Sequence, residues 1–305
     1  MLSVSSGRSA SRRNSAVAGM TEPEARFYES QGLRLHYADW GNETAPPLVL
    51  IHGGLDHCRN WDAIARALQP HFHIVAPDLR GHGDSEWAKG SSYTLVDNVV
   101  DLARLIAFAE LKDAAIVGHS MGGMVAQAYA GTFPERVSRL AVLDGTFLSY
   151  AAPTPIDEQM SRWIKQLERI GQYEPTAFKT IEEAASRLSG RNKRLKPELA
   201  LHLARHGVRQ HADGLYRWKF DHYQRARAPY RLSPDDYIGL WSRIASPTLL
   251  MWGSESFLPD PEAAGLLAHF KHAEMLKIAG AGHWLHHDRL EEVLAALRRF
   301  LGLAG

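Results

Sequence analysis

Ser120 lies in the segment GHSMGG, residues 118–123, which has the spacing G-x-S-x-G. A short apolar run at 114–118 precedes it and a helical stretch at 122–132 follows, so the serine is predicted on a strand-to-helix turn. The small residues on both sides let the chain pass close by, and the turn raises the hydroxyl above the sheet. The helix N-terminus beneath it favours developing negative charge. The segment therefore predicts a nucleophilic serine.

His283 lies in the loop GAGHW, residues 280–284, before the C-terminal helix. The small residues of this loop let the imidazole reach over the sheet edge toward Ser120. The chain contains 16 histidines, so the residue type alone carries little information. Its place after the last predicted strand, downstream of the serine, gives the order Ser…His that suits a strand-turn-helix nucleophile. We therefore predict His283 as the general base.

The glycine-rich segment HGGL, residues 52–55, follows the apolar run 47–51. Such a loop can aim a backbone N–H at a substrate carbonyl oxygen. The predicted donors are the N–H of Met121, directly after the serine, and the N–H of Gly54 or Leu55. Each donor of this kind is worth roughly 100- to 1000-fold in rate, because it stabilises the charge of the tetrahedral intermediate.

Short apolar runs alternate with helical stretches along most of the chain. The predicted strands are 47–51, 73–77, 114–118, 140–143, 248–252 and 275–278, preceded by a hairpin at 26–29 and 33–40. The predicted helices are 60–69, 95–111, 122–132, 261–270 and 288–302. Runs this short and apolar are typical of strands buried on both faces. The alternation predicts an α/β fold with a doubly wound, mostly parallel sheet.

Residues 146–240 interrupt this alternation. They contain no convincing buried strand, and an apolar stripe between Met160 and Ile170 has helical spacing. We predict a helical lid at 146–240, inserted into a core made of 20–145 and 241–305. The Ser- and Arg-rich, acid-free residues 1–19 are predicted to be a disordered tail. A targeting segment or a start codon assigned too early are the alternatives for that tail.

The composition argues against several classes of protein. Lys and Arg total 35 against 34 Asp and Glu, which gives no support to nucleic-acid or anionic-membrane binding. Cys58 is the single cysteine, so an intrachain disulfide is excluded and nothing indicates an oxidising compartment. No apolar run approaches the roughly 18 residues of a membrane-spanning helix. We expect a cytoplasmic protein with a small-molecule substrate; the sequence does not indicate an oligomeric state.

Several of these segments together resemble the α/β-hydrolase superfamily over about residues 30–302. The resemblance rests on HGG at 52–54, DLRGHGDS at 78–85, GHSMGG at 118–123, WG at 252–253 and GAGHW at 280–284. The segment 78–85 is a structural stretch in that superfamily, so Asp78 and Arg80 are assigned to the scaffold. The segments 218–221 and 252–257 are also similar to serine hydrolase-like proteins.

The resemblance leaves the acid of the triad open between two residues. Many relatives carry an Asp three residues after the glycine that ends the penultimate strand, and Ser256 occupies that position here. Asp144 directly follows the strand at 140–143, where other relatives place their acid. Glu255 precedes the usual position by one residue, and its longer side chain could make up the difference in distance to the histidine. The acid fixes the histidine tautomer and stabilises the imidazolium.

Other side chains are candidates for substrate contact. Asp56 and His57 follow the HGG loop, and His119 and Trp284 adjoin the predicted nucleophile and base. The predicted apolar pocket is lined from the lid by Met160, Trp163, Trp218, Phe220 and Tyr223.

Signals for metals and cofactors are weak. His202 and His206 stand four residues apart on a predicted helix, but the Glu of H-E-x-x-H is absent, so no metal is predicted. No G-x-G-x-x-G or Walker motif occurs, and no cofactor is predicted. A basic run in the lid, from Arg187 through Arg191 to Lys196, is interpreted as a solvated helix end that can also attract acidic substrates.

The resemblance implies a cofactor-free serine hydrolase of the carboxylesterase type, acting on an ester, lactone or thioester through an acyl-enzyme. A carbon–carbon bond hydrolase or a perhydrolase using the same triad is one alternative, and a non-catalytic ligand-binding protein is another. Haloalkane dehalogenases and epoxide hydrolases of this fold need Asp at the position of Ser120, so those activities are not expected.

Overall fold

The computed structural model of the protein describes residues 22–89, 93–148, 154–226, 229 and 231–303. The tail predicted at 1–19 lies outside the described residues. The strands of the main sheet are β1 (Glu24–Ser30), β2 (Leu33–Asp39), β3 (Pro47–Ile51), β4 (His73–Pro77), β5 (Ala114–His119), β6 (Val137–Leu143), β10 (Thr248–Gly253) and β11 (Ala273–Ile278).

These eight strands form one sheet in the order β1-β2-β4-β3-β5-β6-β10-β11. The hairpin of β1 and β2 is antiparallel and joins β4 in the antiparallel sense. The six strands from β4 to β11 in this order run parallel to one another. The central strands are buried on both faces, which explains why their sequences are continuously apolar. The predicted doubly wound, mostly parallel sheet is confirmed.

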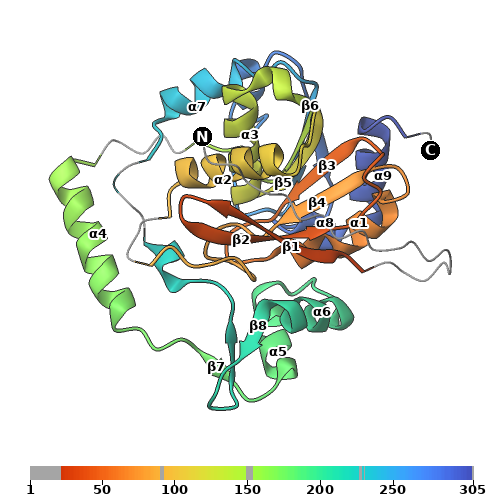
Figure 1. Ribbon diagram of the computed structural model, residues 1–305. Coiled ribbons are helices and arrows are strands. Elements are labelled where there is room, and N and C mark those ends of the chain that lie inside the picture. Colours follow the sequence, from red (N-terminus) through yellow and green to blue (C-terminus); the bar gives the residue numbers. More distant parts are fainter. Residues whose placement is uncertain (1–21, 90–92, 149–153, 227–228, 230, 304–305) are drawn as a thin grey trace, which may run out of the picture.

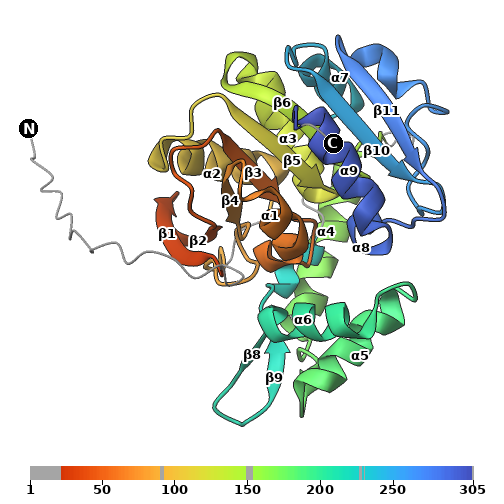
Figure 2. The same cartoon turned by 90° about the vertical axis from the view of Figure 1, so that its right-hand side faces the viewer.

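Helices cover both faces of the sheet (Figures 1 and 2). The helices α2 (Leu95–Phe108), α3 (Met121–Thr132) and α7 (Pro234–Trp241) share one hydrophobic cluster, and α1 (Asp62–Leu68), α8 (Leu285–Asp288) and α9 (Leu290–Phe300) share the other. Leu105 and Trp241 are buried in the first cluster, and Leu68 and Leu297 in the second. Short 3-10 helices lie at Cys58–Trp61, Pro134–Arg136, His222–Arg225 and Leu266–His269.

A separate layer is inserted between β6 and β10, and we call residues 154–226 the insertion (Figure 1). It contains the helices α4 (Ile156–Gly171), α5 (Ile181–Arg191) and α6 (Pro197–Gly207). It also contains a small sheet of β7 (Ala177–Phe178), β8 (Val208–Gln210) and β9 (Tyr216–Trp218), in the order β7-β9-β8. Only helices were expected here, because strands of two or three residues are too short to show an alternating pattern.

Two other predictions differ from the structure. The segment 261–270, predicted as a helix, forms turns followed by the 3-10 helix Leu266–His269, and Gly265 between them has φ +72°. The helix α7, predicted as part of the lid, packs against α3, with Trp241 buried in the core. The insertion therefore ends before α7.

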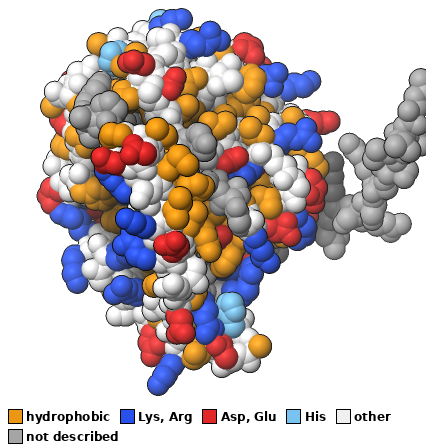
Figure 3. Space-filling model, turned by 90° about the vertical axis from the view of Figure 1, so that its left-hand side faces the viewer, with side chains coloured by type: hydrophobic (Ala, Val, Ile, Leu, Met, Phe, Trp, Pro, Cys, Tyr) orange, Lys and Arg blue, Asp and Glu red, His pale blue; other side chains and the backbone are white. Residues whose placement is uncertain are grey.

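The helix α4 stands at the edge of the molecule, and none of its residues is fully buried. Ile156, Met160 and Ile164 are exposed on it. Figure 3 views the molecule from the side on which α4 lies in Figure 1, and it shows hydrophobic side chains among charged ones on that face. Within the described residues, no helix has the length and apolar character that a bilayer span needs.

Candidate active site

Ser120 occupies the sharp turn between β5 and α3, as its motif predicts. Its backbone has φ +51° and ψ −119°, a strained conformation for a residue with a side chain. Its N–H donates to the carbonyl of Leu143 at 2.9 Å, which fixes the turn against β6. A Cβ at Gly118 would lie 2.4 Å from the Gly122 carbonyl oxygen, and one at Gly122 would lie 2.4 Å from the Ile51 carbonyl oxygen. Glycine is therefore required at both flanking positions.

His283 connects Ser120 to Asp144. Its Nε2 lies 2.9 Å from Ser120 Oγ, and its Nδ1 lies 2.5 Å from Asp144 Oδ2. Because the carboxylate can only accept, Nδ1 carries the proton and Nε2 accepts from the serine hydroxyl. The three side chains therefore have the order and contacts of a Ser-His-Asp triad.

The sheet register explains why Asp144 reaches this place. Leu143 pairs with His119 of β5 on one side and with Met251 of β10 on the other, so these strands end at one level. Asp144 is the next residue; it turns there with φ +47°, and its N–H donates to the Met251 carbonyl at 2.8 Å. Its side chain is fully buried at 0% exposure.

Glu255, the alternative acid, lies elsewhere. Its side chain is 53% exposed and forms an ion pair with Arg194 of the insertion. The geometry therefore favours Asp144 over Glu255 as the partner of His283. The sequence reasoning missed a role for Ser256: its Oγ donates to Asp144 Oδ2 at 2.5 Å. Its position, where many relatives carry the acid, was the signal for it.

The backbone N–H groups predicted as oxyanion donors differ in the hydrogen bonds that they make in the structure. Met121 is the first residue of α3, so its N–H has no intrahelical acceptor. The N–H of Gly54 likewise has no acceptor among the described residues, and a Cβ there would lie 3.8 Å from Met121 Sδ. The prediction that Leu55 could serve as a donor is wrong, because its N–H donates to His82 Nε2 at 3.0 Å and is not free for a substrate. The donor pair consistent with the geometry is Met121 and Gly54.

His82 fixes the loop that carries these donors. Leu55 has φ +60°, so the loop is strained beside Gly54. His82 accepts the Leu55 N–H at Nε2, and its Nδ1–H donates to the Arg80 carbonyl at 3.0 Å. Burial, reinforced by the neighbouring His52, lowers the pKa of His82 to about 3. The ring therefore stays neutral and keeps its acceptor nitrogen at ordinary pH.

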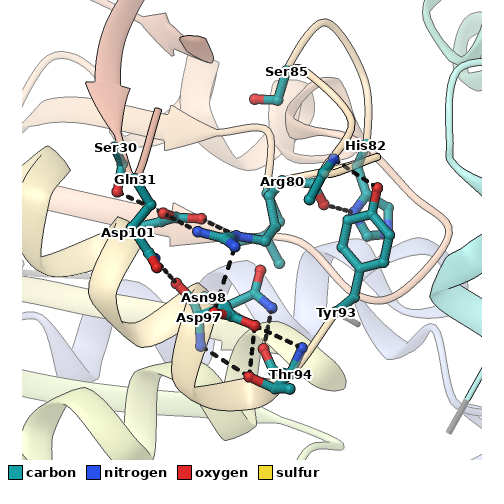
Figure 4. A network of polar contacts seen from close by, with 12 residues as sticks. Ser30, Gln31, Arg80, His82, Ser85, Tyr93, Thr94, Asp97, Asn98 and Asp101 are labelled. Atoms are coloured by element: carbon teal, nitrogen blue, oxygen red, sulfur yellow. Dashed lines mark hydrogen bonds and ion pairs between the residues drawn. The ribbon is translucent and has the colours of Figure 1, made fainter. Parts of the chain in front are cut away.

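Arg80 is itself held by a buried ion pair (Figure 4). Its Nε and Nη2 donate to the two oxygens of Asp101 at 2.6 and 2.7 Å, and Ser30 Oγ donates to the same carboxylate at 2.6 Å. Both partners are buried. This network supports the scaffold role predicted for Arg80, since it anchors the carbonyl to which His82 is bonded.

His119, predicted to touch substrate, lies beneath the site instead. It is 1% exposed, and its Nε2–H donates to the His283 carbonyl at 2.9 Å. Burial, followed by the proximity of His283, lowers the pKa of His119 to about 3. This hydrogen bond holds the backbone of the His283 loop from beneath, on the side away from the substrate.

A cavity of about 500 Å³ opens from His283 toward the insertion. Four predicted contact residues line it: Asp56, His57, Trp218 and Trp284, together with Phe220 from the predicted pocket wall. Met160, Trp163 and Tyr223 are not among its lining residues. The helix α4 packs against the 3-10 helix His222–Arg225, and no residue of either element lines the cavity. Lining residues that the sequence did not indicate include Leu188, Leu195, Leu203, Phe257 and His287, whereas Arg191 belongs to the basic run expected to attract acidic substrates.

Among these unpredicted lining residues, Phe257 contacts the ring of His283. Its ring centroid is 4.4 Å from that of His283, although the residue is 72% exposed. Most of the cavity wall is apolar, and its polar side chains are Asp56, His57, Arg191, Asn192, Lys219, His283 and His287. Such a wall suits an acyl chain or another apolar substrate part.

One cluster of potential metal ligands consists of His36, Cys58 and Asp78. Asp78 accepts hydrogen bonds from His36 Nδ1 at 2.7 Å, from Cys58 N at 2.7 Å and from Asp84 N at 2.9 Å. Burial opposes ionisation of Asp78, yet the His36 hydrogen bond lowers the pKa of that carboxyl. Burial raises the pKa of the Cys58 thiol. The cluster holds the 78–85 segment and offers no deprotonated thiol.

A second cluster joins Asp62 to His202 and His206 of α6. Asp62 already accepts from Arg59 Nη2 at 2.7 Å, and Arg66 lies 3.4 Å from the same oxygen. Burial, followed by the charge of Arg59, lowers the pKa of His206 to about 4. Two guanidinium groups beside the carboxylate disfavour a further cation there.

Comparison with known proteins agrees with this architecture. A family model described as alpha/beta hydrolase fold matches residues 46–290. Esterase YbfF of Escherichia coli (strain K12) is 27% identical over 264 residues, which are 84% of this chain and 92% of that protein. The 3-hydroxybutyrate-oligomer hydrolase of Cupriavidus necator is 31% identical over 269 residues, 82% of this chain and 87% of that one.

A solved structure extends the similarity to three dimensions. The thioesterase domain from the curacin biosynthetic pathway superposes with a TM-score of 0.82 at 28% identity. The match covers 91% of this chain and 99% of that domain, so it includes the insertion as well as the sheet.

Proposed function

The chain belongs to the alpha/beta hydrolase fold family, and from that membership we propose that it is a serine hydrolase of carboxylic esters, lactones or thioesters. The observation that carries the proposal is the position of His283. Its Nε2 is 2.9 Å from Ser120 Oγ while its Nδ1 is 2.5 Å from Asp144 Oδ2. A neutral imidazole held in that tautomer can take the serine proton and becomes an imidazolium beside a buried carboxylate.

The proposed reaction has two steps. Ser120 Oγ attacks the substrate carbonyl carbon as its proton passes to His283 Nε2. The carbonyl oxygen becomes an oxyanion, which the N–H groups of Met121 and Gly54 stabilise. The tetrahedral intermediate then expels the alcohol or thiol, which takes the proton from His283. A water molecule, deprotonated by the same histidine, hydrolyses the acyl-enzyme and releases the acid.

The proposed substrate class rests on the relatives and on the cavity. An esterase, an oligomer hydrolase and a thioesterase domain are among the similar proteins, which supports acyl esters and thioesters. The apolar wall of the cavity, with Trp218, Phe220 and Trp284, supports an apolar segment next to the scissile carbonyl. The insertion contributes Trp218 and Phe220, so it acts as the lid in this proposal.

The test is hydrolysis of a chain-length series of p-nitrophenyl esters by wild type and Ser120→Ala, with labelling of both by a fluorophosphonate. We expect turnover and labelling in wild type and a loss of about 10³-fold or more in kcat in the variant. Hydrolysis retained by folded Ser120→Ala would overturn the serine mechanism. Labelling without ester turnover would indicate the carbon–carbon hydrolase or perhydrolase alternative, and neither activity would indicate a binding protein.

A further inference from the structure

The cavity contains two Lys or Arg side chains among the described residues, Arg191 and Lys219, and only one of them has an acidic partner. Lys219 Nζ forms an ion pair with Asp84 Oδ2 at 2.9 Å. The guanidinium of Arg191, the last residue of α5, has no ion pair or hydrogen bond with any described residue. Its guanidinium can therefore bind an anion without giving up an internal partner.

The surroundings of Arg191 are positively charged. Partial burial, followed by the charges of Arg225 and Arg187, lowers the pKa of Arg191. Arg225 also lies over the ring of Phe220, another cavity residue, at 5.8 Å. An incoming negative charge relieves the repulsion within this group of arginines as well as pairing with one of them.

The end of α5 is tied to the candidate catalytic loop. Asn192, next to Arg191, is buried, and its Nδ2 donates to Asp288 Oδ1 at 3.0 Å. The other oxygen of Asp288 accepts from the N–H of Gly282 at 2.8 Å, and Gly282 directly precedes His283. These two hydrogen bonds, through the one carboxylate of Asp288, fix the backbone beside Arg191 relative to the loop of His283. A cation whose backbone is held relative to His283, in a cavity that His283 also lines, favours a substrate with a negative charge at a suitable distance from its ester.

We propose that Arg191 binds a carboxylate on the substrate, so that the preferred esters carry a free carboxylate at the end remote from the scissile bond. This inference rests on the proposed function. The planar guanidinium matches a carboxylate with two parallel N–H···O bonds, and the apolar walls cover the chain between the two ends. Half-esters of dicarboxylic acids and esters of ω-hydroxy acids have this pattern.

The experiment compares charged and neutral esters of equal length. On the acyl side, mono-4-nitrophenyl adipate, pimelate and suberate are measured against 4-nitrophenyl hexanoate, heptanoate and octanoate. On the alcohol side, the butyrate ester of 6-hydroxyhexanoic acid is measured against hexyl butyrate. The quantity compared is the ratio of kcat/KM for the charged ester to kcat/KM for its neutral match.

We expect this ratio to fall about tenfold or more in Arg191→Gln for at least one length, and by less in Arg191→Lys, which keeps the charge. The matched control is Lys193→Gln, an exposed basic residue two positions on that does not line the cavity; its ratio should equal that of wild type. A ratio independent of Arg191 in both series would overturn the inference, whereas turnover of the neutral esters would still support the proposed function.

Binding is measured separately, so that failed turnover does not leave the inference untested. Calorimetry with Ser120→Ala and monoethyl adipate should give a dissociation constant at least tenfold weaker when Arg191→Gln is added. Equal affinities in the two proteins would contradict the proposal, whatever the esters show.

Discussion

Ser256 donates its hydroxyl proton to Asp144 Oδ2 at 2.5 Å, the same oxygen that accepts from His283 Nδ1. The hydroxyl direction is fixed because Ser256 Oγ also accepts the N–H of Leu258 at 3.0 Å. Asp144 Oδ1 is buried without a partner among the described residues. One carboxylate oxygen therefore carries both contacts, and Ser256 holds the proposed acid, Asp144, from the strand end where many relatives carry the acid itself.

This relationship predicts that the acid can be moved. In Asp144→Ala, kcat should fall by about 10³-fold or more, because the imidazolium loses its counter-charge. Adding Ser256→Asp places carboxylate oxygens one bond beyond the present Oγ, toward the space that the Asp144 side chain vacates. The double variant should have a kcat at least tenfold higher than that of Asp144→Ala. The measurement is kcat for p-nitrophenyl butyrate.

The matched control is Asp144→Ala with Ser256→Asn, which has the same shape without the charge. It should remain as inactive as Asp144→Ala alone. Equal rates for the Asp and Asn versions at position 256 would show that this strand end does not place a carboxylate against His283.

Glu255 gives the opposite prediction from Asp144. Since its carboxylate pairs with Arg194 and is half-exposed, Glu255→Gln should keep kcat within about threefold of wild type. Asp144→Asn, assayed beside it, should lose orders of magnitude, and circular dichroism of both would confirm folding. A comparable loss in Glu255→Gln would make Glu255 the functional acid and contradict the assignment from geometry.

The His82 contact predicts a role in holding the oxyanion loop. In His82→Ala the Leu55 N–H loses its acceptor, so the strained Gly54-Leu55 turn relaxes and the predicted Gly54 donor shifts. We expect kcat to fall about tenfold or more with KM within about threefold, because a displaced donor weakens the transition state more than the ground state. A change confined to KM would place the effect in substrate binding instead.

Much of this architecture could be predicted from local sequence. The strands β3 and β4 match their predicted bounds, since buried parallel strands are continuously apolar and end at turns. Ser120 and His283, both singled out by glycine-containing loops, lie within hydrogen-bond distance of each other in the structure. Close backbone approach requires the glycines at 118 and 122, and Gly280 has a positive φ. The choice between Asp144 and Glu255 was not available locally: both follow strands of suitable length, and only the pairing of β6 with β10 shows which carboxylate meets the histidine.

Other features were missed for different physical reasons. The strands β7, β8 and β9 are too short to have a period, and they are stable only within the packing of the insertion. Leu55 was chosen as a possible donor because sequence cannot show that an N–H is already bonded, here to a histidine 27 residues away. Such long-range hydrogen bonds leave no spacing signal.

The buried histidines predict how stability depends on pH. His82 and His119 each have a pKa lowered to about 3, by burial first and then by His52 and His283 respectively. The ordinary pKa of histidine is 6.5, so between pH 6.5 and 3 the unfolded chain binds protons that the folded chain does not. The free energy of unfolding therefore falls as pH falls through this window and is unaffected by these groups above it. At pH 5 each histidine should destabilise the folded state by about 2 kcal/mol.

Replacing one of them should reduce this acid sensitivity. Urea denaturation of wild type and His119→Gln at pH 7.5 and pH 5 gives the loss of unfolding free energy for each protein. We expect the loss to be smaller by about 2 kcal/mol in the variant, whatever its stability at pH 7.5. His211→Gln, the same substitution at an exposed histidine, is the matched control and should behave as wild type. Equal losses in His119→Gln and wild type would mean that His119 takes up its proton in the folded protein. The assignment of a neutral His119 ring beneath His283 would then be wrong.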